Sequence, residues 1–135
     1  MAAQVRPAGA LDPVDRLYRA INPNFYQDGA LTTGVFFMKK RDKLEDGPSV
    51  GIEKLIPLER FHAFKPTWGV GQFPVSVPLE LQLRVQPLPA AAWGEYSQAH
   101  AVITDYQALT NSRINEVQRV LRDQLQKNIL IPPQM

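Results

Sequence analysis

The chain has no cysteine and only two histidines, His62 and His100, among its 135 residues. Without cysteine, a disulfide scaffold, a thiolate metal site and a thiol nucleophile are all excluded. The two histidines lie far apart in the sequence, and neither belongs to a pair at metal-ligand spacing such as His-x-x-x-His. We therefore expect no metal site and a structural role for each histidine.

Signatures of several enzyme classes are also missing. The segment 69–74, Gly-Val-Gly-Gln-Phe-Pro, has only two glycines, and Pro74 prevents a helix from beginning where a dinucleotide-binding turn needs one. No Gly-x-Ser-x-Gly motif is present, and the four serines show no nucleophile context, although Ser97 is close to His100 in sequence. The residue pattern therefore predicts no catalytic residues and no cofactor.

Long apolar runs and a strong net charge are absent as well. No apolar run approaches the roughly 18 residues that would span a bilayer, and the first residues lack the apolar stretch of a secretory signal. The net charge is only +2, which by itself does not predict nucleic-acid binding. Because 44% hydrophobic and 21% charged residues are typical of a globular domain, we expect one cytoplasmic domain without membrane contact.

The first patterned segment follows residues 1–11, which we expect to form a flexible tail. The pair Asp12-Pro13 suits the beginning of a helix, and Asn22-Pro23 would end it. The apolar residues between these pairs have helical spacing: Val14, Leu17, Tyr18 and Ile21. A helix is therefore expected here, with a strand from Leu17 to Ile21 as the alternative.

Later segments favour strands by their β-branched, aromatic or alternating residues. The clearest is Leu79 to Gln86, in which apolar and polar residues alternate strictly. Ser49 to Leu55 is either a strand or a strand that runs into a helical turn. Further strands are expected at Val35 to Met38, Trp68 to Val77 and His100 to Thr104.

An amphipathic helix is expected from Thr110 or Asn111 to about Lys127. Its apolar face would consist of Ile114, Val117, Val120, Leu121 and Leu125. Together the patterns predict a single α+β domain at 12–128, with a mostly antiparallel sheet of four or five strands and the C-terminal helix packed on one face. Residues 129–135 would form an apolar tail, in which Ile129, Leu130 and Ile131 are expected to contact a partner or a second copy.

A basic run offers a different kind of surface. Lys39, Lys40, Arg41 and Lys43 place four positive charges within five residues. On a loop after a strand, such charges are able to bind phosphates, so that nucleic acid is a possible partner. The alternative is a solvated hairpin tip, whose charge is partly neutralised by the acidic residues that follow.

Two stretches resemble known proteins. The stretch Leu17-Tyr18-Arg19-Ala20-Ile21-Asn22-Pro23, together with Ser49-Val50, Trp68-Gly69-Val70 and His100-Ala101-Val102-Ile103, resembles small uncharacterised bacterial proteins found beside toxin–antitoxin or phage-defence components. This resemblance implies a bacterial accessory protein that acts through contacts, and it supplies no catalytic residues.

The opening Leu17-Tyr18-Arg19 is also similar to the start of the RES-domain toxins, which act on NAD and belong with ADP-ribosyltransferase-like folds. The resemblance implies that Arg19 holds the dinucleotide phosphates, next to Tyr18, with Glu95 in the place of a catalytic glutamate. The chain departs from that group after these residues, since it lacks the Arg-Trp-Asn motif and the Gly-x-x-x-x-Tyr strand that follow.

The leading hypothesis is a non-enzymatic protein-binding module, such as an adaptor or immunity-type subunit of a bacterial defence or toxin–antitoxin system. It rests on the absence of a catalytic set and on the apolar segment Ile129 to Ile131. One alternative is an NAD-consuming, ADP-ribosyltransferase-like toxin. The other is a nucleic-acid-binding protein that uses the loop from Lys39 to Lys43.

Overall fold

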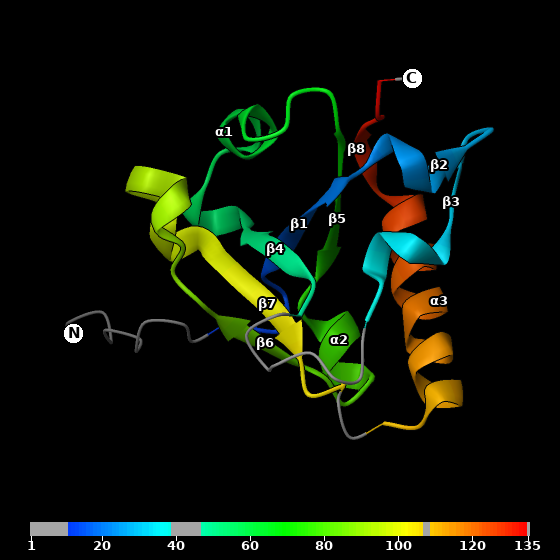
Figure 1. Ribbon diagram of the computed structural model, residues 1–135. Coiled ribbons are helices and arrows are strands. Elements are labelled where there is room, and N and C mark those ends of the chain that lie inside the picture. The colour runs from blue at the N-terminus through cyan, green and yellow to red at the C-terminus, as the bar shows by residue number, and fades with distance from the viewer. Residues whose placement is uncertain (1–10, 39–46, 107–108, 135) are drawn as a thin grey trace, which may run out of the picture.

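The computed structural model describes residues 11–38, 47–106 and 109–134, and it places one sheet between two layers of helices (Figure 1). Within these ranges the main sheet has six strands in the order β6-β7-β4-β1-β5-β8, and every neighbouring pair is antiparallel. The strands are β1 (Arg16–Ile21), β4 (Ser49–Ile52), β5 (Gly69–Pro74), β6 (Arg84–Pro87), β7 (His100–Thr104) and β8 (Ile129–Ile131). A small second sheet pairs β2 (Tyr26–Gln27) with β3 (Ala30–Leu31).

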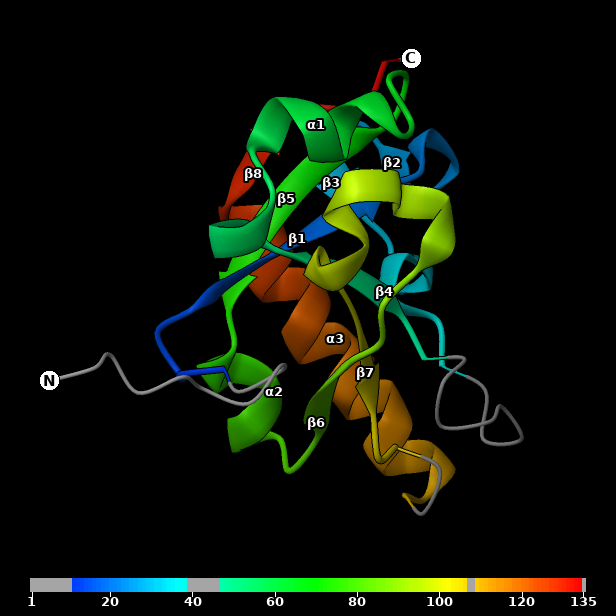
Figure 2. The same cartoon turned by 90° about the vertical axis from the view of Figure 1, so that its left-hand side faces the viewer.

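Helical segments cover both faces of the main sheet (Figures 1 and 2). The long helix α3 (Asn111–Lys127) lies on one face, and α1 (Leu58–Ala63) lies on the other beside the 3-10 segment η5 (Ala91–Ala99). The shorter elements are α2 (Ser76–Glu80), η1 (Pro23–Phe25), η2 (Thr33–Phe36) and η4 (Glu53–Leu55). The predicted α+β class, with a C-terminal helix on one face of an antiparallel sheet, is therefore confirmed.

The helix α3 forms where the sequence predicts it because its cap and its apolar face agree. The Thr110 side chain accepts a hydrogen bond from the backbone N–H of Arg113 at 3.1 Å, which satisfies one of the free donors of the first turn. Its buried apolar residues are Ile114, Val117, Leu121 and Leu125. Gly71 of β5 lets this face approach closely, since a Cβ at Gly71 would lie 2.5 Å from Cδ1 of Leu125.

The helix predicted between Asp12 and Asn22 is wrong, and the alternative strand is observed. This segment is β1, the strand between β4 and β5. Both faces of β1 are covered: Leu17 packs toward α3, and the adjacent Tyr18 packs toward α1. Because both faces are buried, the sequence of β1 does not show the apolar–polar alternation that is typical of a half-exposed strand. Val14, which the helical pattern requires on the apolar face, is 81% exposed.

Two further predictions of strands need correction. Val35 to Met38 is not a strand: η2 ends at Phe36, and Val35 and Phe36 are buried beneath α3 as part of a 3-10 turn. In Leu79 to Gln86, the alternating pattern hides a change of element, because α2 ends at Glu80 and Gln82 takes a positive φ of 64°. Only the second half of that segment is a strand, β6.

Other predicted elements agree with the structure. The segment from Ser49 is a strand that runs into a helical turn, namely β4 followed by η4, and His100–Thr104 is β7. Ile129–Ile131, expected as an apolar tail outside the domain, is instead β8 and pairs with β5 at the edge of the sheet. This strand raises the number in the main sheet above the four or five predicted. The predicted N-terminal tail lies outside the described residues except for Leu11, which packs against the core.

Candidate functional site

A cleft of about 340 Å³ lies on the face of the sheet that α1 covers. Four aromatic side chains line this cleft, which we call the aromatic cleft: Phe61, Phe64, Trp68 and Trp93. Its polar lining comes from Arg19, Ser49, His62 and Lys65, and none of the described aspartates or glutamates lines it. The volume falls within the range of small-molecule sites, which are typically apolar with a few polar groups that fix orientation.

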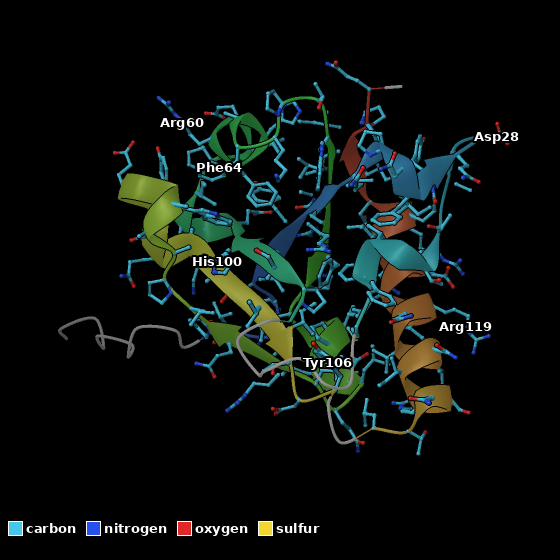
Figure 3. The ribbon with its side chains drawn as sticks, viewed as in Figure 1. Asp28, Arg60, Phe64, His100, Tyr106 and Arg119 are labelled. Carbon is cyan, nitrogen blue, oxygen red and sulfur yellow. The ribbon has the colours of Figure 1, made fainter. Side chains whose placement is uncertain are left out.

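The aromatic walls come from three separate elements. Phe64 follows α1 and stacks on Trp93 of η5, with ring centroids 4.9 Å apart and an interplanar angle of 29°. Phe61 of α1 meets the same Trp93 edge-on at 5.7 Å. Phe64 remains 40% exposed, and Figure 3 shows it beneath α1, on the same side of the molecule as His100. The cleft therefore presents flat aromatic surface at a position that a ligand is able to reach.

Arg19 occupies the point where β1 and β4 separate. These strands pair only at Leu17↔Ile52 and Tyr18↔Gly51, and Arg19 is the next residue of β1 after the last pair. Its Nη1 donates to the Ser49 carbonyl at 2.7 Å, while Nε and Nη2 donate to the Val35 carbonyl at 3.1 and 2.8 Å. One side chain thus connects β1, β4 and η2.

The charge of Arg19 has no anionic partner among the described residues. All three of its hydrogen bonds go to neutral carbonyls, and none of the ion pairs in the described residues includes it. Burial of the guanidinium lowers the pKa of Arg19 to about 10, so that it remains a cation at neutral pH. The guanidinium lies over the Phe36 ring, with Cζ 5.4 Å from its centroid, and Arg19 is paired with Gly71, whose Cβ position faces Leu125 of α3, so that the side chain is on the α3 side of the sheet. An enclosed cation without a counter-charge is unfavourable, and because Arg19 lines the cleft and its pKa is perturbed, it is a candidate site residue.

Ser49 and His100 form a hydrogen-bonded pair at the same cleft. The two residues come from the adjacent strands β4 and β7, and Nε2 of His100 lies 2.7 Å from Oγ of Ser49. On the other side of the ring, Nδ1 lies 2.6 Å from the Leu88 carbonyl oxygen. Because a carbonyl only accepts, Nδ1 carries the proton, and Nε2 of the neutral ring accepts from the Ser49 hydroxyl. Trp93 packs edge-on against the imidazole at 4.8 Å.

This arrangement has the form of an activated nucleophile: a hydroxyl, a base within hydrogen-bond reach, and a third group that orients the base. Of the pair, Ser49 lines the cleft. This hydrogen-bonded pair was not expected from the sequence, in which the serines show no nucleophile context. The sequence offered no signal for it, because Ser49 and His100 are distant in the chain and meet only through the pairing of β4 with β7. Ser97, the serine close to His100 in sequence, is not a partner of that ring, whose two nitrogens face Ser49 and the Leu88 carbonyl.

The structure separates the residues of the predicted NAD site. Arg19 lines the cleft, whereas Tyr18 is buried and packs on Phe61 with ring centroids 5.4 Å apart. Burial, with smaller contributions from Glu53 and Glu59, raises the pKa of Tyr18. Glu95 and Arg60 line a neighbouring hollow. This hollow shares Phe64 and Trp93 with the cleft.

The remaining predicted sites lie elsewhere. In β8, Ile129 packs against the core below α3, Ile131 packs against the cluster below α1, and Leu130 is 40% exposed. Lys39, Lys40, Arg41 and Lys43 lie outside the described residues. His62 lines the cleft with its Nε2 3.1 Å from the Trp68 carbonyl oxygen.

No three histidine, aspartate or glutamate side chains in the described ranges gather as ligands for a metal ion. Within the same part of the chain, no helix has the length and apolar character needed to cross a membrane. A comparison of the whole chain with family models, curated proteins and solved structures found no match in any of the three sets.

Proposed function

We propose that the protein binds a small planar anion in the aromatic cleft, with Arg19 contacting the negative group and the aromatic walls contacting the planar group. Mononucleotides and aromatic carboxylates both have this chemistry. The observation that carries the proposal is the position of Arg19, an enclosed cation without a carboxylate partner among the described residues, at the wall of this cleft.

The electrostatic argument concerns the cost of an enclosed charge. Transfer of a guanidinium from water into protein is unfavourable unless hydrogen bonds and an opposite charge compensate for it. Carbonyl oxygens supply the hydrogen bonds of Arg19 and the Phe36 ring supplies a cation–π contact, but neither supplies a negative charge. Lys65 and His62 add further basic groups to the same lining. A bound anion would supply the missing compensation.

The aromatic walls favour a flat ligand. The Phe64–Trp93 stack and the Trp68 ring present faces on which a planar ring is able to stack. Lys65 already lies over the Trp68 ring, with Nζ 4.7 Å from its centroid. A cation at that position favours an electron-rich or negatively charged group next to the tryptophan.

The proposal includes the NAD hypothesis only in part. Arg19 in an aromatic cleft supports contact with a nucleotide phosphate, but Glu95 is in the neighbouring hollow and Tyr18 is buried. A cleft of about 340 Å³ is near the lower end of ligand-site volumes, which suits one nucleotide better than two. We therefore propose binding of a nucleotide-like anion rather than cleavage of NAD.

Intrinsic fluorescence provides the test, because both tryptophans of the chain line the cleft. We would titrate the protein with AMP and benzoate, and with adenosine and benzamide as their neutral counterparts. The proposal expects saturable quenching by at least one anion, with its neutral counterpart at least about tenfold weaker, which corresponds to about 1.4 kcal/mol. No response to any of the four compounds would contradict it.

The prediction of a protein partner remains a second proposal. It is supported by β8, which forms one edge of the main sheet, and by the exposed side chain of Leu130 on that strand. An exposed strand edge is able to pair with another chain.

A further inference from the structure

We propose that Ser49 is a nucleophile, that His100 is its general base, and that the cleft hydrolyses esters of aromatic carboxylic acids. This inference rests on the proposed function, since the planar anion that the cleft binds would be the carboxylate product. It adds a reaction to what is otherwise a binding site.

The first support is the hydrogen-bonded chain from Ser49 through His100 to Leu88. Its two distances, 2.7 Å from Ser49 Oγ to Nε2 and 2.6 Å from Nδ1 to the Leu88 carbonyl, are those of well-formed hydrogen bonds. The carbonyl fixes the tautomer in which Nε2 is free to take a proton. Both side chains stand on paired strands of the main sheet, which hold the ring and the hydroxyl in place.

The second support is the space in front of Ser49. Gly51 lies two residues further along β4, on the same face, and it has no side chain to fill that space. A Cβ at Gly51 would lie 2.7 Å from the Phe61 ring and 3.6 Å from Trp93. The absence of this Cβ allows both aromatic rings to close over the strand beside Ser49. The hydroxyl thus faces a cleft with an apolar, planar wall, where the ring of an aromatic acyl group would pack.

The third support is the cation nearest to Ser49. The Nη1 of Arg19 lies 2.7 Å from the Ser49 carbonyl oxygen, so that the guanidinium adjoins the residue that would carry the acyl group. The guanidinium itself lies on the α3 side of the sheet, bonded to the Val35 carbonyl and 5.4 Å from the centroid of the Phe36 ring, so that its charge acts on the developing oxyanion across the strand and not by a direct hydrogen bond.

The reaction balances without any other reactant than water. Oγ of Ser49 bonds to the ester carbonyl carbon while its proton moves to Nε2 of His100, and the carbonyl oxygen becomes an oxyanion. When the oxyanion collapses, the bond to the alcohol oxygen breaks, and the alcohol leaves with the proton from Nε2. Water then attacks the acyl-Ser49 ester and gives a proton to Nε2. The Ser49 oxygen regains that proton as the carboxylic acid departs.

A covalent probe tests the nucleophile directly. The wild-type chain would be treated with a fluorophosphonate, digested, and mapped by mass spectrometry. The inference expects one modified serine, Ser49, and a loss of labelling in His100→Gln. Labelling that is absent from Ser49, or no greater there than at the exposed Ser112, would overturn it. Because the labelled residue is mapped in the wild-type chain, this result does not depend on whether a variant folds.

Turnover of 4-nitrophenyl benzoate provides the second readout. We expect Ser49→Ala and His100→Gln to reduce the rate at least about 100-fold, whereas Ser112→Ala on the outer face of α3 retains the wild-type rate. Equal rates in Ser49→Ala and wild type would overturn the inference.

Benzoate binding separates this inference from the proposed function. If benzoate quenches tryptophan fluorescence but Ser49 is unreactive, the binding function stands and the reaction is overturned. If Ser49 is labelled but neither benzoate nor AMP binds, the proposed function fails, and the assigned substrate class is overturned with it.

Discussion

Arg19 and Ser49 stand on neighbouring strands, and the guanidinium of Arg19 donates to the backbone carbonyl of Ser49 at 2.7 Å. The bond lies just beyond the last paired position of β1 and β4. At this point the sheet contains a charged side chain, and the hydroxyl of the same serine lies 2.7 Å from Nε2 of His100. Ser49 therefore connects the cation, through its backbone carbonyl, with the imidazole, through its hydroxyl.

Two glycines on opposite faces of the sheet provide a matched test of the cleft wall. In Gly51→Ala the new Cβ would clash with Phe61, and in Gly71→Ala it would clash with Leu125. We expect each substitution to lower the free energy of unfolding by about 1–3 kcal/mol, as overpacking does. Only Gly51→Ala should also weaken ligand binding in the cleft. Urea denaturation and fluorescence titration measure the two effects, and equal binding by both variants would show that Phe61 and Trp93 do not contact the ligand.

The pH dependence of binding should follow Arg19. Since burial lowers its pKa to about 10, its charge persists through neutral pH and is lost as the pH rises through 10. We expect the contribution of Arg19 to anion affinity, measured as the difference between wild type and Arg19→Gln, to be constant from pH 7 to 9. Above about pH 10 it should fall roughly tenfold per pH unit. A difference that stays constant to pH 11 would contradict the assignment.

The contribution of Arg19 to the free energy of unfolding should rise over the pH range in which its contribution to anion affinity falls. The folded state loses the Arg19 proton near pH 10, whereas the unfolded chain keeps it to a higher pH. Between these values the unfolded state binds more protons, so that the contribution of Arg19 to the free energy of unfolding rises with pH. Denaturation of wild type and Arg19→Gln at pH 9 and 11 measures this change. If the contribution of Arg19 to the free energy of unfolding falls between pH 9 and 11, the surroundings stabilise the charged form of Arg19, which contradicts the expected rise.

The N-cap of α3 permits a test of the fold that does not involve the cleft. Thr110→Ala removes the hydrogen bond to the Arg113 N–H and should lower the free energy of unfolding by about 0.5–2 kcal/mol. Thr110→Ser keeps a capping hydroxyl and should retain most of that stability. Thermal or urea denaturation distinguishes them. The cap has no energetic role if Thr110→Ala unfolds at the same midpoint as wild type.

The partner prediction is tested by Leu130→Lys. Deletion of residues 129–135 is unsuitable, because it would remove a strand of the sheet. Leu130 is 40% exposed, so that the substitution should change stability by no more than about 0.5 kcal/mol. We expect it to reduce self-association or partner capture, measured by light scattering and affinity purification. Leu79→Lys, on α2 and 42% exposed, is the control, and equal loss in both variants would contradict a specific role of β8.

The sequence predicted correctly those elements that have one face on the core and the other face in water. The helix α3 has one face on the core and one in water, so that its apolar spacing is unambiguous. In β1 both faces are buried, and the spacing of Leu17, Tyr18 and Ile21 happens to match a helix. The alternation from Leu79 to Gln86 continues across the end of α2 and a positive-φ turn at Gln82, neither of which changes the pattern of residue types.

The site was less predictable than the fold. Arg19 was singled out by a resemblance at Leu17-Tyr18-Arg19, and the structure places it at a cleft. The Ser49–His100 pair depends on the register of β4 and β7, which opposes Gly51 to His100 and cannot be derived from spacing along one chain. The aromatic walls depend on the meeting of α1 and η5, which are also distant in sequence.

The most direct measurement of the central claim is a thermodynamic cycle between the charge of Arg19 and the phosphate of AMP. Dissociation constants for AMP and adenosine would be measured by tryptophan fluorescence in wild type, Arg19→Gln and Arg16→Gln, the last being an exposed arginine of the same strand. We expect AMP to bind at least about tenfold more tightly than adenosine in wild type and in Arg16→Gln, and equally in Arg19→Gln. The same preference for AMP in all three proteins would contradict an anion site at Arg19.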